Sequence, residues 1–155
     1  MRFPITIILA SIFSGFTTGL FTIRFAVTII LTTLLSFAAG LYLPWWSMAL
    51  VSFLVAFFLY QPRPRNAWLG GFLGLFLLWG LLAIWIDVQN DHILSRRMAI
   101  LFPLGGSSAL LILITALLAG LIGGLAALSG NYLFKYLLHN GSPELKQFMQ
   151  KLLLN

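Results

Sequence analysis

The sequence predicts an all-α, polytopic integral membrane protein: a bundle of five transmembrane helices, with four as the alternative, and a C-terminal amphipathic helix. Charged residues make up 8% and apolar residues 61% of the 155 positions, whereas a soluble domain carries about a quarter charged residues. A helix needs roughly 20 apolar residues to cross a hydrocarbon core of about 30 Å. Four uncharged stretches meet that length: Phe3 to Ile23, Phe25 to Tyr60, Asn66 to Ile86 and Met98 to Phe134.

The first stretch, Phe3 to Ile23, is predicted to be the first transmembrane helix. Met1 and Arg2 ahead of it have the form of a signal peptide, but no polar segment with a small-x-small cleavage site follows, so we expect the helix to be retained. Arg24 then separates this stretch from the next. Because a charge at the bilayer centre costs several kcal/mol, we expect a turn at Phe21 to Phe25. Without that turn the two spans would form one long helix, and the bundle would have four.

The second stretch is too long for one ordinary span and contains Pro44, Trp45 and Trp46. Proline disfavours helical geometry in the preceding residue, and tryptophan favours the headgroup boundary. The sequence therefore predicts a turn here, between helices at Phe25 to Leu43 and Trp45 to Tyr60.

A loop with two prolines and two arginines, Gln61 to Asn66, precedes the fourth predicted span, Trp68 to Ile86. The polar segment Asp87 to Arg97 follows that span. The next apolar piece, Met98 to Leu104, is too short to cross a bilayer, so we expect it to lie at the interface or dip into the bundle.

The fifth span is predicted from Ala109 through Leu128, with a continuation to Phe134, and Ser107 or Ser108 is expected to cap it. After it, Ser142, Pro143 and Glu144 give a helix start signal. The helix that follows has one apolar face and one polar face, and it is predicted to lie on the membrane surface. We therefore divide the chain into a bundle, residues 1–138, and an amphipathic helix, residues 139–155.

The basic residues flank apolar spans instead of forming a continuous stripe, so the net charge of +6 indicates contact with lipid and not with nucleic acid. With five spans, the side that carries more Lys and Arg is expected to be cytoplasmic. This rule places the N-terminus outside and the C-terminus inside, in a bacterial cytoplasmic membrane. The six cations on the inner side are Arg24, Arg63, Arg65, Lys135, Lys146 and Lys151.

Small residues recur at helical spacing in three of the predicted spans. In lipid, helices associate mainly through close backbone approach across such small faces. We expect these faces to pack within the chain, and alternatively against a second copy or another membrane protein. The residues are Gly15 and Gly19, Gly70 and Gly74, and Ala116, Gly120, Gly123 and Gly124.

A row of hydroxyl side chains, Thr28, Thr32 and Ser36, lies on one face of the second predicted span. This row is a candidate lining for a solute path. The alternative, which we favour, is that each hydroxyl bonds a backbone carbonyl one turn back.

One segment brings together both charge signs and a histidine. If the fourth helix continues through it, Asp87 and Asp91 share a face, as do His92 and Arg96. Such a cluster could bind a cation or an anionic headgroup, but an ordinary solvated loop accounts for it equally well, and His139 near the other surface is expected to face solvent. One histidine and two carboxylates are too few ligands to predict a metal. The cluster comprises Asp87, Asn90, Asp91, His92, Arg96 and Arg97.

Several chemistries lack the residues that they require. The chain has no cysteine, so thiolate chemistry and disulfides are excluded. No ionisable residue lies near the middle of a predicted span, which disfavours proton-coupled transport. Ser129 has no histidine or acid in its span to activate it. We therefore expect a non-enzymatic protein without a cofactor.

The layout from Leu43 to Asp87 combines short spans, a Pro/Arg loop and a glycine-bearing span that ends in an aspartate. It resembles the small multispan proteins of the MreD type and the substrate-binding subunits of energy-coupling-factor transporters. Those families usually have six spans, which this chain does not offer, so no functional residue is carried over.

Two functions fit the sequence. The first is a structural or accessory component of a membrane assembly that holds lipid, other membrane proteins or a second copy of itself. The second is a small-solute transporter, channel or substrate-binding subunit that uses Thr28, Thr32 and Ser36 with the segment Asp87 to Arg97. A polar cavity that reaches this segment would favour the second function, and a dry core would favour the first.

Overall fold

A computed structural model describes the backbone of residues 3–102 and 106–154 and the side chains of residues 23–102 and 106–151. Its ordered elements are helices, so the predicted all-α class is confirmed for the described residues. Three of these helices are long and apolar enough to cross a membrane, namely α3, α5 and the Ile23–Tyr42 part of α1. In chain order the helices are α1 (Phe3–Tyr42), α2 (Ser47–Phe58), α3 (Pro64–Gln89), α4 (Ile93–Leu101), α5 (Ser108–Asn140) and α6 (Pro143–Leu154).

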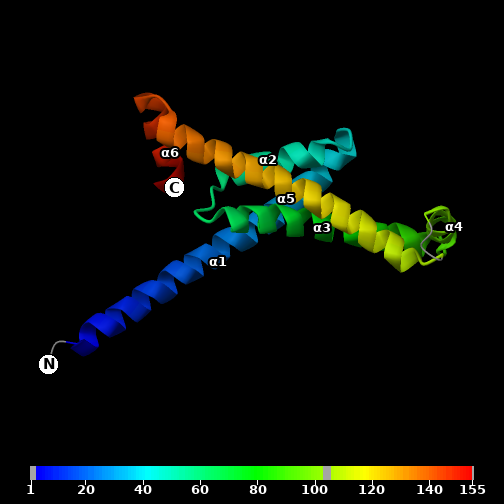
Figure 1. Cartoon of the computed structure of the whole chain (residues 1–155), viewed down its shortest axis with the longest axis horizontal. Coiled ribbons are helices and arrows are strands. Elements are labelled where there is room, and N and C mark those ends of the chain that lie inside the picture. Colours follow the sequence, from blue (N-terminus) through cyan, green and yellow to red (C-terminus); the bar gives the residue numbers. More distant parts are fainter. Residues whose placement is uncertain (1–2, 103–105, 155) are drawn as a thin grey trace.

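The turn predicted at Phe21 to Phe25 is wrong, because α1 is one continuous helix of 40 residues. No proline or glycine interrupts this window, and the exposed Arg24 keeps its place in the helix, where its carbonyl accepts a hydrogen bond from Thr28 Oγ1 at 2.8 Å. Figure 1 shows the N-terminal part of α1 extending away from the other helices. One helix thus replaces the first two predicted spans, and the count of five is not found.

The break predicted at Pro44 is confirmed, since α1 ends at Tyr42 and α2 begins at Ser47. The 12 residues of α2 span only about 18 Å, which is less than the thickness of a hydrocarbon core. Leu59 through Arg63 continue the chain without helical structure to the start of α3. Tyr60 in this segment stacks on Phe134 of α5, with 5.0 Å between the ring centroids.

An antiparallel pair, α3 and α5, forms the centre of the molecule (Figure 1). The two backbones approach closely at Gly71, where an added Cβ would lie 2.5 Å from the Gly123 carbonyl oxygen. Leu75 and Ala119 are buried in the same contact region. On its other side α3 packs against α1, and both α3 and α5 continue past the α1–α2 turn toward α4.

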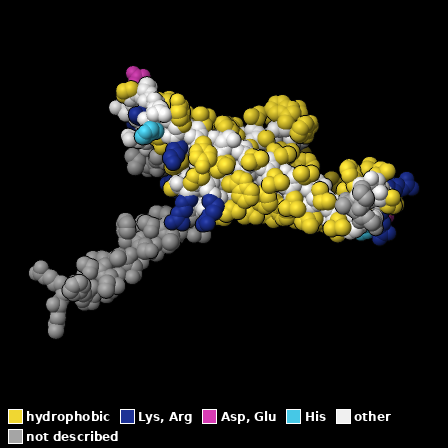
Figure 2. Space-filling model, viewed as in Figure 1, with side chains coloured by type: hydrophobic (Ala, Val, Ile, Leu, Met, Phe, Trp, Pro, Cys, Tyr) yellow, Lys and Arg dark blue, Asp and Glu magenta, His cyan; other side chains and the backbone are white. Residues whose placement is uncertain are grey.

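The two ends of the molecule carry the charges. Figure 2 shows Lys and Arg side chains gathered at opposite ends, with a band of hydrophobic side chains between them. At one end, α5 passes into α6, whose first turn is capped because Ser142 Oγ accepts from the Leu145 amide at 3.4 Å. The helix α6 begins at Pro143, directly after Ser142, as the start signal in the sequence predicts. Met149 of α6 is buried while Phe148 is exposed.

Candidate functional site

The polar segment after α3 reverses the direction of the chain. Asp91 and His92 have φ angles of 50° and 59°, in the left-handed region that Asp and His adopt more readily than most residues. The fourth span therefore does not continue as a helix through this segment, and the shared helical faces expected for that case do not form. Instead α4 starts at Ile93, earlier than the apolar piece predicted from Met98, and includes Arg96 and Arg97.

The reversal brings two side chains within hydrogen-bond distance of Asp87, which is 8% exposed. His92 Nδ1 lies 2.6 Å from Asp87 Oδ2, and Ser95 Oγ donates to the other carboxylate oxygen. The His92 amide also donates to the Asp87 carbonyl at 3.1 Å. Hydrogen bonds to an ionised group are stronger than neutral ones, so Asp87 joins the end of α3 to the start of α4.

The other members of the predicted cluster lie outside this junction. Asn90 Nδ2 donates to the Ile86 carbonyl at 3.0 Å, and Asp91 is exposed. Arg96 and Arg97 are exposed as well. The structure thus brings together Asp87 and His92 from the six residues named in the sequence, and adds Ser95.

Ser95 was missed because its role depends on where α4 begins. The spacing of three residues from His92 places the two side chains together once a new helix starts at Ile93. The residue directly before Ile93 is His92, which is not one of the preferred capping residues and makes no side-chain cap bond, so the sequence does not mark this start.

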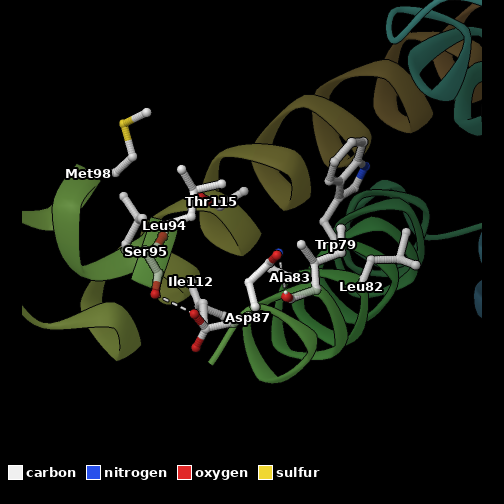
Figure 3. A pocket seen from close by; sticks show the side chains of 12 residues that line it. Trp79, Leu82, Ala83, Asp87, Leu94, Ser95, Met98, Ile112 and Thr115 are labelled. Carbon is white, nitrogen blue, oxygen red and sulfur yellow. Dashed lines mark hydrogen bonds between the residues drawn. The ribbon is translucent and has the colours of Figure 1, made fainter. Parts of the chain in front are cut away.

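A groove of about 430 Å³ adjoins this junction and runs between α3, α4 and α5. Figure 3 shows Asp87 between Ser95 on one side and Ala83 and Trp79 of α3 on the other. The polar residues of the lining are few, and one of them, Thr115, donates its hydroxyl to the Leu111 carbonyl at 2.9 Å. The lining comprises Trp79, Leu82, Ala83, Ile86, Asp87, Asn90, Leu94, Ser95, Met98, Leu111, Ile112 and Thr115.

The order of the hydrogen bonds bears on the chemistry of this site. In a nucleophilic triad the hydroxyl bonds the imidazole, which in turn bonds the carboxylate. Here Ser95 and His92 both bond Asp87 directly, so the serine hydroxyl is bonded to the carboxylate and not, as a triad would require, to the imidazole. Among the described residues no group of three or more His, Asp and Glu side chains is placed to hold a metal ion. The arrangement is suited to binding an apolar chain beside a carboxylate that already has two partners.

The hydroxyl row lies in the contact between α1 and α3. Thr28, Thr32 and Ser36 are buried, and Thr32 Cβ would lie 2.9 Å from a Cβ added to Gly74. Thr28 bonds the Arg24 carbonyl one turn back, as expected. In the described part of the chain, Thr32 Oγ1 and Ser36 Oγ have no hydrogen-bond partner, so the expectation of backbone bonding is wrong for these two.

Three polar side chains meet where the non-helical segment leaves α2. The backbone N–H of Gln61 donates to Asn131 Oδ1 at 2.9 Å, and the side-chain Nε2 of Gln61 donates to Thr28 Oγ1 at 3.1 Å. Irregular backbone at membrane depth is tolerated where protein groups satisfy it. Gln61 and Asn131 were not candidates from the sequence because they are 70 positions apart and each reads as a local loop or interface residue.

The four small residues of α5 that the sequence singled out face α3, whereas Gly130 faces Phe53 of α2. Ala116 is buried opposite Gly80, and a Cβ added to Gly120 would lie 3.0 Å from the Phe72 ring. A Cβ added to Gly124 would lie 2.8 Å from the Trp68 indole nitrogen. Gly15 and Gly19 lie outside the residues whose side-chain surroundings the structure describes.

Comparison of the chain with protein-family models, with curated proteins and with solved structures found no match.

Proposed function

We propose that the protein is a non-enzymatic integral membrane protein that serves as a structural or accessory component of a membrane assembly. The main support is the close approach of the α3 and α5 backbones at the centre of the fold. A Cβ on Gly71 would lie 2.5 Å from the Gly123 carbonyl oxygen, and one on Gly123 would lie 2.6 Å from the Gly71 carbonyl oxygen. Backbones this close leave no room for a solute between α3 and α5.

The outer surface supports the same proposal. Large apolar side chains of α1, α3 and α5 are exposed, among them Leu34, Leu81 and Leu125 at 59%, 64% and 60%. Such a surface needs lipid or partner helices to cover it. The grooves beside α3 and the amphipathic helix α6 then provide places where lipid or a partner segment is held.

The proposed location is a bacterial cytoplasmic membrane with the C-terminus inside. The support is the grouping of cations at two ends of the molecule (Figure 2) and the larger number at the α5–α6 end. Because α1 does not turn at Arg24, the argument from five crossings for an outside N-terminus no longer applies.

Substituted-cysteine labelling tests whether the hydroxyl row lines a water-filled path. The natural chain has no cysteine, so each variant carries a single thiol. We expect Thr32→Cys in lipid vesicles to resist a charged methanethiosulfonate reagent, because Thr32 is fully buried against α3. Gln89→Cys, at an exposed position, is the positive control and should react.

Rapid labelling of Thr32→Cys would overturn the accessory role. Thr32→Val gives the complementary result, since an apolar side chain of similar size should leave a structural component unchanged. If instead a solute flux through vesicles changes with Thr32→Val, the protein is a transporter.

One observation favours transport as a second candidate function: the groove between α3, α4 and α5 reaches the buried carboxylate of Asp87. In that case, neutralising both acids with Asp87→Asn and Asp91→Asn should change the uptake of cations by vesicles that contain the protein. Equal uptake by the wild type and the double variant would remove this candidate.

A further inference from the structure

A second cavity, of about 340 Å³, lies between α1, α2 and α3 beside the α1–α2 turn. It does not share the α4 and α5 lining of the groove at Asp87, although Trp79 and Leu82 border both. Its volume falls within the range of small-molecule sites, about 300 to 1,000 Å³. The lining comprises Ser36, Phe37, Gly40, Leu41, Leu43, Trp45, Ser47, Met48, Leu78, Trp79 and Leu82.

Two hydroxyl groups in this lining lack a partner. Ser36 and Ser47 are 3% and 2% exposed, and within the described part of the chain neither Oγ atom has a hydrogen-bond partner. Buried polar atoms are nearly always hydrogen-bonded, and an unmet one carries a desolvation cost. Ser36 belongs to α1 and Ser47 to α2, and both residues are part of the lining of this one cavity. We take their two unpartnered hydroxyls as the groups that a bound polar group would satisfy.

The rest of the lining defines the ligand. Apart from the two serines, the cavity is bordered by glycine and by apolar or aromatic side chains, and no charged residue borders it among those described. Of the two tryptophans that border the cavity, Trp45 is exposed, and Nε1 of Trp79 already lies 3.0 Å from Met48 Sδ. Water needs two to four polar partners and leaves apolar cavities dry, so water alone would fill only the part near the serines.

One residue of the cavity lining has the character of a membrane-interface residue. Trp45, which borders it, is 73% exposed, and exposed tryptophans favour the membrane interface. Gly40, also in the lining, leaves open space, with nothing within 4 Å of an added Cβ. An amphiphile could thus enter from the bilayer with its polar end near the interface.

We propose that this cavity binds an uncharged lipid. Its hydroxyl or ester carbonyl bonds Ser36 and Ser47, and its hydrocarbon chain lies along Leu78 and Leu82. The absence of a charged residue from the described lining favours this class over a lipid whose phosphate or amine would enter the cavity. The inference does not depend on the proposed function, because a transporter and an accessory protein could each hold such a lipid.

A photoactivatable diacylglycerol with a diazirine in one acyl chain tests the proposal. The wild-type protein is placed in phosphatidylcholine nanodiscs with a small fraction of this probe, irradiated and mapped by mass spectrometry. We expect adducts on peptides that contain Met48 or Trp79, and we expect unlabelled diacylglycerol to compete. The double variant Ser36→Ala, Ser47→Ala loses two hydrogen bonds to the lipid, so it should form about tenfold fewer adducts.

A filled cavity gives an independent variant. Gly40→Leu places a side chain in the open space and should abolish the adducts, while Ala38→Leu, at an exposed position on the same helix, should leave them unchanged. In the absence of diacylglycerol, the double serine variant should unfold at the same temperature as the wild type or a higher one. The reason is that it no longer buries two hydroxyls without hydrogen-bond partners.

Three outcomes would overturn the proposal. The first is equal labelling at these peptides by a phosphatidylcholine probe, which would show only general contact with acyl chains. The second is adduct formation that Gly40→Leu leaves intact. The third is a failure of unlabelled diacylglycerol to compete in the wild-type protein, a result that does not depend on the folding of any variant.

Discussion

Asp87 is the residue on which the α3–α4 junction depends. Its side chain is buried. One carboxylate oxygen lies 2.6 Å from His92 Nδ1, and the other accepts a hydrogen bond from the Ser95 hydroxyl. The sequence singled out Asp87 and His92 because acids and a histidine stood together in an apolar chain. The pairing itself was beyond prediction, since it requires two consecutive residues with positive φ, Asp91 and His92, for which no glycine gives a signal.

Asp87→Asn should weaken this junction, because an amide forms weaker hydrogen bonds than an ionised carboxylate. Amide hydrogen exchange over residues 90–101 should then accelerate by about tenfold. Asp91→Asn is the matched control, since Asp91 is exposed and Asn also adopts its left-handed backbone. Equal exchange in the two variants would show that the carboxylate of Asp87 does not hold α4.

Among the elements, those with local signals were predicted well. Pro44 with its tryptophans marked the end of α1, and Ser107 caps α5 by accepting from the Leu110 amide at 3.4 Å. The turn predicted at Arg24 was wrong, because the helix continues through Arg24, which is exposed. The short α2 and its continuation through Gln61 depend on Asn131, a contact across 70 positions, which no local pattern encodes.

The contact between α3 and α5 permits a matched pair of glycine substitutions. Gly71→Ala would force its Cβ to 2.5 Å from the Gly123 carbonyl oxygen and from Ala127 Cβ, and it should destabilise the protein by about 1 to 3 kcal/mol. Gly40→Ala meets nothing within 4 Å and should leave stability unchanged or raise it by at most about 1 kcal/mol.

Unfolding in mixed detergent micelles, followed by circular dichroism, measures both variants. If Gly71→Ala proved as stable as Gly40→Ala, the close approach of α3 and α5 would not be required. That result would also remove the main support for a closed centre.

For the whole molecule, composition alone predicted the helical class and the apolar length of the helices, because burial in lipid places strong limits on charge. The number of crossings could not be predicted from composition. It depends on whether the helix continues through Arg24 and on where the chain runs after α2. The cations at the α5–α6 end allow a test of orientation. Gln89→Cys and Gln147→Cys place single thiols at exposed positions near opposite ends.

In intact cells we expect an impermeant maleimide to label Gln89→Cys at once and Gln147→Cys only after the membrane is permeabilised. The reason is the preference of Lys and Arg for the cytoplasmic side. The reverse pattern would place the C-terminus outside. Labelling of both before permeabilisation would mean that the two ends of the bundle face the same compartment.

The unequal reach of the helices gives the molecule a taper. The α1–α2 turn borders Leu82 of α3, while α3 and α5 continue beyond it to α4 (Figure 1). Among the described residues, segments of α1, α2, α3 and α5 fill the cross-section near Gly71, and α3, α5 and the short α4 fill it near Asp87. In a bilayer, such a wedge takes up more lateral area in one leaflet than in the other. The free energy of inserting it should therefore depend on the curvature of the membrane.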